Sequence, residues 1–173
     1  IDVAQANGLV HIAATTGNSS EQLVKRKYAM QDMAIIEMGD FAGAVFKHLK
    51  KVPIERVSIC GGFGKITKLA NGHLDLNSRV SSIDFPYLAA LAQTLGADKR
   101  LQETIRAANT SIEAYSLCLN AGIDLAAAVC QQALVFARRH LPHTTALEIL
   151  AINRKGELIA SSTDSAAFRG AGL

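Results

Sequence analysis

The sequence predicts an α/β fold with a mainly parallel sheet and an antiparallel hairpin at one edge. Short apolar runs alternate with helical patterns three times in the N-terminal part of the chain, which favours strand–helix units. Two further apolar runs near the other end are separated by a tight turn, which predicts a hairpin. Hydrophobic residues make up 49% of the 173 residues, so the chain can bury a core.

The first strand–helix unit follows the end of a helix. Residues 1–8 predict the last turns of a helix that stops at a glycine. Residues 9–15 are an apolar run between turn residues, which predicts a buried strand. A glycine turn comes next, and Asn18 or Ser19 can cap a helix that continues to about Ala29.

The second and third units follow directly. Residues 33–38 predict a strand, and residues 41–51 have apolar positions at helical spacing. Residues 55–60 predict a third strand, which leads into a glycine-rich segment. A short helix is expected over 65–72, where a glycine ends it.

The second half of the chain is expected to insert helices before the hairpin. The helices are expected at 84–95, 98–108, 110–120 and 124–140, and the hairpin strands at 145–152 and 157–160. Together these elements predict a Rossmann-like three-layer fold with a helical insertion and a C-terminal β-hairpin. Residues 1–160 would form one α/β domain, and 161–173 a flexible tail.

Composition argues against several classes of protein. The net charge is only +3, aromatic residues make up 5% and there is no Trp, so nucleic-acid binding is not expected. The three cysteines show no CxxC spacing, so we expect buried thiols in a cytoplasmic protein and no metal. The apolar stretch 123–137 is too short and too polar to span a membrane. The first residue is Ile1 and the opening helix lacks its start, which suggests a cropped chain.

The glycine-rich segment matches neither common nucleotide-binding motif. A P-loop needs a hydroxyl residue after its lysine, where this chain has Ile66. The dinucleotide pattern needs a third glycine where this chain has Thr67, whose side chain hinders close helix–strand approach.

General physics still favours an anionic ligand at this segment. Glycines after a strand let backbone N–H groups approach a ligand, and a helix N-terminus attracts anions. Lys65 and Lys68 would add positive charge on one helical face. The alternative is a tight turn with two solvated lysines.

The stretch 61-GGFGKITKLANGHLDLNSR-79 resembles the cobalt-precorrin-5B (C1)-methyltransferase family of cobalamin biosynthesis. Further motifs of that family occur in the same order along the chain, from the opening IDVA through 16-TGNSSE-21, 38-MGDFAG-43, Asp84 and 88-LAALAQTLGA-97 to 156-GELIA-160. The resemblance therefore covers residues 1 to about 160.

The resemblance implies that the chain takes part in methyl transfer from S-adenosylmethionine to C1 of a cobalt-precorrin, converting cobalt-precorrin-5B to cobalt-precorrin-6A in the anaerobic type of cobalamin synthesis. It implies a cofactor pocket in the loops at the sheet edge, formed by Thr16, Gly17, Asn18, Gly39, Asp40, Gly61, Gly62 and Gly64. It also implies contacts to the anionic cobalt-tetrapyrrole from Lys65, Lys68, His73, Asn77, Ser78 and Arg79. The family's proteins have a further N-terminal domain, which would be the partner of this one.

Several alternatives remain open from the sequence. Asp40 could instead cap the helix that follows it, and Arg79 could pair with Asp75 or Asp84. Asn77 stands where the family usually has histidine, so no proton can be carried there at neutral pH. At the level of function, the alternatives are a non-catalytic module that binds cofactor or tetrapyrrole, and a nucleotide-dependent oxidoreductase with a degenerate loop.

Other candidate residues have ordinary structural explanations. His140 and His143 are interpreted as loop residues rather than metal ligands, and Asn109 with Thr110 as a helix cap. The apolar segment 124–137 is expected to face the core, with the interface of a homodimer as the alternative.

Overall fold

The computed structural model describes residues 1–164 and contains one five-stranded sheet. The strands are β1 (His11–Thr15), β2 (Ile35–Glu37), β3 (Arg56–Gly62), β4 (Ala146–Ile152) and β5 (Leu158–Thr163). They lie in the order β2-β1-β3-β4-β5, with all neighbours parallel except the antiparallel β4–β5 pair. The predicted mainly parallel sheet with its C-terminal hairpin is confirmed.

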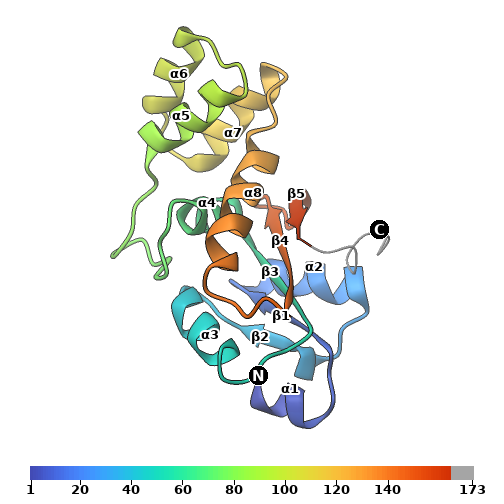
Figure 1. The fold of residues 1–173 in the computed structure, drawn as a ribbon. Coiled ribbons are helices and arrows are strands. Elements are labelled where there is room, and N and C mark those ends of the chain that lie inside the picture. The colour runs from blue at the N-terminus through green and yellow to red at the C-terminus, as the bar shows by residue number, and fades with distance from the viewer. Residues whose placement is uncertain (165–173) are drawn as a thin grey trace.

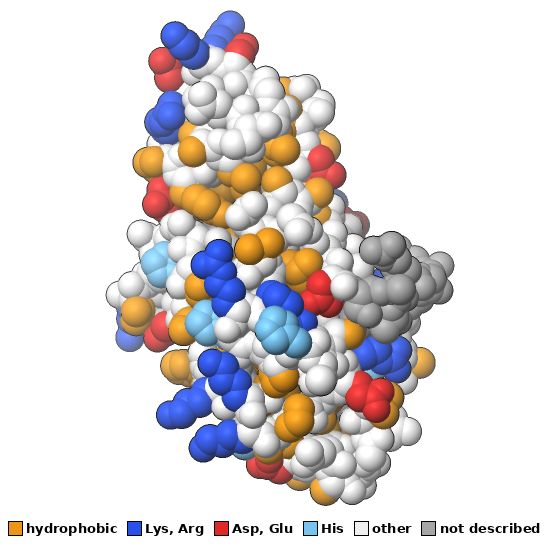
Figure 2. Space-filling view, in the orientation of Figure 1, with side chains coloured by type: hydrophobic (Ala, Val, Ile, Leu, Met, Phe, Trp, Pro, Cys, Tyr) orange, Lys and Arg blue, Asp and Glu red, His pale blue; other side chains and the backbone are white. Residues whose placement is uncertain are grey.

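Helices cover both faces of the sheet and extend beyond one end of it (Figure 1). The helical elements are α1 (Asp2–Ala6), α2 (Asn18–Tyr28), the 3₁₀ turn η1 (Asp32–Ala34), α3 (Ala42–Leu49), α4 (Phe63–Ala70), α5 (Phe85–Thr94), α6 (Lys99–Arg106), α7 (Ser111–Asn120) and α8 (Leu125–Arg138). Of the four helices expected in the insertion, α5–α7 project away from the sheet beyond α4 and α8 (Figure 1), whereas α8 itself packs against β4 and β5. Figure 2 shows hydrophobic side chains on this projection, with charged ones at its tip.

Alternation along the strands divides the core into two clusters. Ile12, Val57 and Ile149 belong to the larger cluster, which also contains the buried side chains of α3, α4 and α8. Ala13 and Cys60 belong to the smaller cluster, which contains the buried side of α2. The period of two thus produces the three layers. The apolar side of α8 is buried within the chain, as the sequence predicts.

Two predicted boundaries differ from the structure. The segment 61–64 is not a loop, because β3 continues through Gly62 and α4 starts at Phe63. At the other end, β5 pairs with β4 as far as Thr163, so residues 161–163 belong to the hairpin and not to the expected tail. Residues 165–173, the remainder of that tail apart from Asp164, lie outside the described residues.

Within residues 1–164, no helix combines the length and the apolar character that crossing a membrane would require.

A polar network lies on the α2 face of the sheet. Ser58 donates to Oε2 of Glu148 at 2.9 Å, and Tyr28 donates to the same oxygen. His11 Nε2 lies 2.9 Å from Ser58 Oγ, and its ring meets that of Tyr28 edge-on. Burial, followed by the charge of Arg56, lowers the pKa of His11 to about 4. Burial raises the pKa of Glu148.

This network predicts an acid-sensitive fold. His11 binds a proton in the unfolded chain below pH 6.5 but in the folded chain only below about pH 4. Its contribution to stability is therefore complete above pH 6.5 and is lost as the pH falls to 4, by at most about 2 kcal/mol for a partly exposed ring. Glu148 has the opposite slope, because its raised pKa favours the protonated form in the folded chain.

Urea unfolding of the protein and of His11→Gln between pH 4 and 7 measures how much His11 contributes to the free energy of unfolding. We expect the stability difference between the two proteins to change through this window, with the variant losing less stability in acid. A difference that is constant with pH would contradict the assignment.

Candidate functional site

The carboxyl ends of the four parallel strands meet at one edge of the sheet. Backbone hydrogen bonds hold the loops there together. The amides of Met38 and Gly39 donate to the Thr15 carbonyl at 2.9 and 3.1 Å, and the Thr16 amide donates to the Cys60 carbonyl at 3.1 Å. Ligands of open α/β sheets bind beyond this edge. The segments that follow β1 and β2 and the β3–α4 junction, which were expected to form the cofactor pocket, thus lie side by side.

The loop after β1 uses its backbone groups internally. Gly17, and not Asn18 or Ser19, is the N-cap of α2. Ser20 Oγ accepts from the amides of Thr16 and Gly17, both at 3.1 Å. These two amides therefore already have an acceptor, and the Asn18 side chain is exposed. Of the residues expected to bind the cofactor, Thr16, Gly17 and Asn18 are therefore the least available to it.

The two glycines at the end of β3 have different surroundings. A Cβ on Gly61 would lie 2.7 Å from Cγ2 and 3.0 Å from Oγ1 of Thr16, so close packing requires glycine there. A Cβ on Gly62 would meet nothing within 4 Å. Because Gly62 is the N-cap of α4 and offers no capping side chain, the first amides of that helix remain open. The structure thus leaves bare backbone facing open space at this junction.

A pocket of about 310 Å³ lies beside this junction. Its lining brings together residues from the loop after β2, the β3–α4 junction, α4 itself and the segment before α5: Asp40, Gly62, Gly64, Lys65, Lys68, Leu76, Ser78 and Ile83. Six of these eight belong to the sets expected to bind cofactor or tetrapyrrole. The pocket therefore joins the two expected groups of ligands in one place.

Asp40 is the electrostatic centre of this pocket. Its carboxylate forms an ion pair with Lys65 and accepts from Asn77 Nδ2 at 3.2 Å. The N-cap of α3 is Phe41, and no side chain caps that helix. Asp40 is thus not a helix cap, and its carboxylate is held by Lys65 and Asn77.

Lys68 is the least neutralised cation of the pocket. Its side chain is buried, with the whole residue 7% exposed, and Nζ donates to the Leu76 carbonyl at 3.0 Å. No carboxylate within residues 1–164 lies within ion-pair distance of it. Burial, and then the charge of Lys65, lowers the pKa of Lys68. An anionic ligand in the pocket would relieve both effects.

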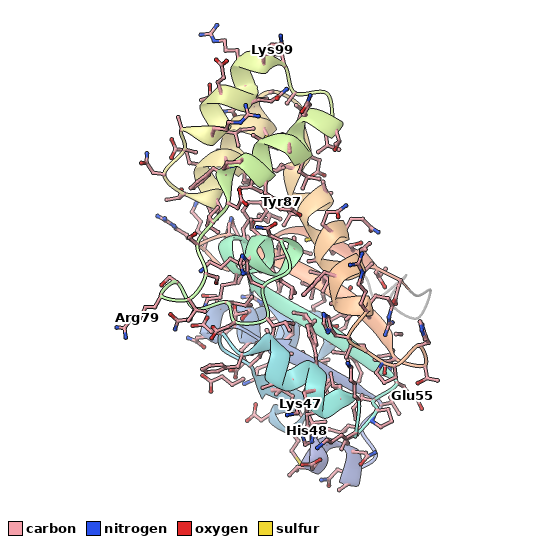
Figure 3. The ribbon with its side chains drawn as sticks, turned by 60° about the vertical axis from the view of Figure 1, so that its left-hand side comes forward. Lys47, His48, Glu55, Arg79, Tyr87 and Lys99 are labelled. Carbon is pink, nitrogen blue, oxygen red and sulfur yellow. The ribbon has the colours of Figure 1, made fainter. Side chains whose placement is uncertain are left out.

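Three expected ligands of the tetrapyrrole lie outside the pocket lining: Asn77, which bonds to Asp40, His73 and Arg79. His73 is half-buried after α4, and its amide donates to the Lys68 carbonyl at 3.0 Å. Arg79 is exposed, and its side chain extends away from the body of the molecule (Figure 3). In the described part of the chain it pairs with neither Asp75 nor Asp84.

Sequence reasoning missed a second pocket on the other side of the same glycines. It has a volume of about 250 Å³ and is lined by Gly62, Phe63, Gly64, Thr110, Ser111, Ile112, Ile152, Asn153 and Arg154. One feature could have indicated this pocket. Because β4 runs parallel to β3, the turn after Ile152 lies at the same edge of the sheet as Gly62. The expected helix cap is confirmed, because Thr110 Oγ1 accepts from the Glu113 amide at 3.1 Å.

The remaining candidates have structural roles. His140 stacks on Phe46 with ring centroids 5.7 Å apart. Burial raises the pKa of Cys60 to about 12, which keeps it a thiol. Among residues 1–164, no three His, Cys, Asp or Glu side chains are grouped so as to hold a metal ion.

Comparison with known proteins gives consistent matches. The family model described as "CbiD, C-terminal domain" matches residues 75–163. A cobalt-precorrin-5B C(1)-methyltransferase of Marinomonas sp. (strain MWYL1) is 56% identical over 177 residues, which cover 95% of this chain and 46% of the relative. The protein of the same name from Pseudomonas aeruginosa (strain LESB58) is 56% identical, with 95% and 45% covered. No solved structure matches the chain significantly.

The chain thus spans about half the length of the curated relatives it matches. The resemblance expected from its ordered motifs is confirmed. Because the family model covers more than half of the 173 residues and the relatives agree with it, the chain belongs to the CbiD family, and its residues 75–163 match the C-terminal domain of that family.

Proposed function

We propose that the chain takes part in transferring a methyl group from S-adenosylmethionine to C1 of cobalt-precorrin-5B, which gives cobalt-precorrin-6A. The relatives' names support methyl transfer to C1 of cobalt-precorrin-5B, and the methyl donor and the product belong to the proposal. The observation that carries the assignment to this chain is the pocket in which open glycine backbone adjoins the buried cation Lys68. It offers N–H donors and positive charge to anionic groups of the two reactants.

The pocket supplies the kind of catalysis that this reaction needs. S-Adenosylmethionine brings a methyl group that its sulfonium already activates, and the carbon that attacks belongs to the macrocycle. The protein therefore has to bind, orient and exclude water, and orientation alone can lower a barrier by about 7–11 kcal/mol. The Asp40–Lys65 pair, held by Asn77, gives the wall of the pocket a fixed geometry.

We place the carboxylates of the tetrapyrrole near Lys68 and Ser78, with Arg79 as an outer contact. Lys68→Met should weaken the binding of a polycarboxylate corrin such as cobyrinic acid by about 10-fold or more, since a charge-assisted hydrogen bond contributes about 1.5–3 kcal/mol. Arg79→Ala should weaken it less, because that side chain is exposed. Fluorescence or calorimetric titration measures both, with circular dichroism as the control for folding. A larger loss of affinity for Arg79→Ala than for Lys68→Met would show that the tetrapyrrole binds outside the pocket.

A labelled methyl-transfer assay tests the proposed function itself. The protein is incubated with cobalt-precorrin-5B and S-adenosylmethionine carrying a deuterated methyl group. We expect mass spectrometry to show one labelled methyl on the tetrapyrrole, and NMR to place it at C1. If the tetrapyrrole stays unlabelled under conditions where both ligands bind, the chain is a module that binds its ligands without catalysing methyl transfer. Oxidation of NADH in the parallel control would instead favour the oxidoreductase.

A further inference from the structure

The second pocket lies between the start of α4, the start of α7 and the β4–β5 turn. It shares Gly62 and Gly64 with the first pocket, so both pockets lie at the same strand–helix junction. No motif of the sequence pointed to it. Its chemistry can be derived from Ser111, Ile112 and Arg154, which line it.

Ser111 carries a buried hydroxyl that faces the pocket. The residue is 6% exposed and lines the cavity. Its Oγ lies 3.1 Å from the point where a Cβ on Gly64 would be, so only glycine leaves room beside it. None of the side-chain hydrogen bonds among residues 1–164 involves this oxygen. This hydroxyl is therefore available to a polar ligand atom that enters the pocket.

The helix that begins at Ser111 adds open amides. The first N–H groups of a helix have no partner within it. Thr110 Oγ1 serves the amide of Glu113, the third residue of α7. The amides of Ser111 and Ile112 are therefore left at the pocket, and the dipole of this ten-residue helix favours an anion there.

Arg154 brings a full positive charge to the same cavity. Its position is fixed by the hairpin turn, in which Asn153 Oδ1 accepts from the amides of Lys155 and Glu157 at 2.9 and 3.0 Å. No acid of the described chain forms an ion pair with Arg154. The turn fixes the backbone of Arg154, and its side chain is exposed at the pocket. A guanidinium without a counter-ion suits a carboxylate, which it can bind through two hydrogen bonds.

We propose that this pocket is a carboxylate-binding subsite, in which Arg154, the Ser111 hydroxyl and the first amides of α7 hold the anionic end of a ligand. The rest of that ligand passes over the open face of Gly62 into the first pocket. The identity of the ligand rests on the proposed function. On that basis, the subsite holds either the amino-acid end of the methyl donor or a side-chain carboxylate of the tetrapyrrole. Both carry the same chemical group, and competition distinguishes them.

The test begins with a probe that needs neither reactant. ¹⁵N NMR follows the amides of Ser111 and Ile112 while the protein is titrated with propionate, and with propionamide as the uncharged control. We expect saturable shifts with propionate only. Arg154→Gln should weaken the binding of propionate about 10-fold, the loss of one charge-assisted hydrogen bond. Lys155→Gln, which removes a neighbouring charge that does not line the pocket, should leave it unchanged.

Two ligands then identify the source of the carboxylate. Displacement of propionate by S-adenosylhomocysteine, but not by 5′-methylthioadenosine, assigns the subsite to the methyl donor. Displacement by cobyrinic acid assigns it to the macrocycle. If propionate binds and neither ligand displaces it, the subsite stands and the proposed function loses support. The absence of propionate-specific shifts, or equal shifts in Arg154→Gln, overturns the subsite whatever the outcome of the methyl-transfer assay.

Discussion

Gly62→Val is expected to abolish ligand binding while the protein stays folded. The backbone of Gly62 has φ −56° and ψ 144°, which valine adopts readily. A Cβ there meets no protein atom within 4 Å, so the new side chain projects into the space that both pockets share. We expect the affinity for S-adenosylhomocysteine to fall roughly 100-fold or more, which is about 2.7 kcal/mol.

The folding of this variant is measured alongside its binding. Replacing glycine by valine at an N-cap should cost about 1 kcal/mol or less, so urea unfolding should change little. Calorimetric titration then measures binding on folded protein. Wild-type affinity in a folded Gly62→Val would show that the open face of this glycine is not part of the site.

Gly61→Val, one residue earlier, is expected to lose stability but to retain ligand binding. A Cβ on Gly61 would lie 2.7 Å from the Thr16 side chain and 3.3 Å from Ile66 Cδ1. The residue is buried in β3, opposite Ala151 of β4, so the strand cannot move away without breaking its pairing. Overpacking of this kind costs about 1–3 kcal/mol, and we expect a loss of stability in that range.

Equilibrium unfolding in urea measures this loss, and Gly62→Val is the matched control with the same change in chemistry. At temperatures where Gly61→Val remains folded, it should retain most of its ligand affinity, because Gly61 lines neither pocket. Unchanged stability in Gly61→Val would show that Thr16 can rotate aside, and that close packing does not require this glycine.

The fold could be predicted because its signals are local. Apolar runs at 9–15 and 55–60 overlap β1 and most of β3, and glycines mark the ends of helices. The junction at Gly62 could not be predicted, since glycines after a strand normally indicate a loop. The strand continues there because Gly61 and Gly62 pair with Ala151 and Ile152, a contact about ninety residues away that no local pattern contains.

The candidate site was predictable only in part for the same reason. The motif that contains Lys65 and Lys68 pointed to one wall of the pocket. The pairing of Lys65 with Asp40 depends on the order of the strands. The approach of Ser111 depends on the packing of α7 against α4, and that of Arg154 on the pairing of β4 with β3. The sequence distinguishes Gly61 from Gly62 in no way, although the structure gives one a packing role and the other an open face.

Calorimetric titration of the protein with S-adenosylhomocysteine, beside NADH as a control, tests the central claim most directly. The claim is that the strand–helix junction at Gly62 and its two pockets hold the reactants of a methyl transfer. It predicts that S-adenosylhomocysteine binds, that NADH does not, and that Gly62→Val removes the binding. Binding of NADH alone, or S-adenosylhomocysteine binding that is unaffected by a folded Gly62→Val, would contradict it.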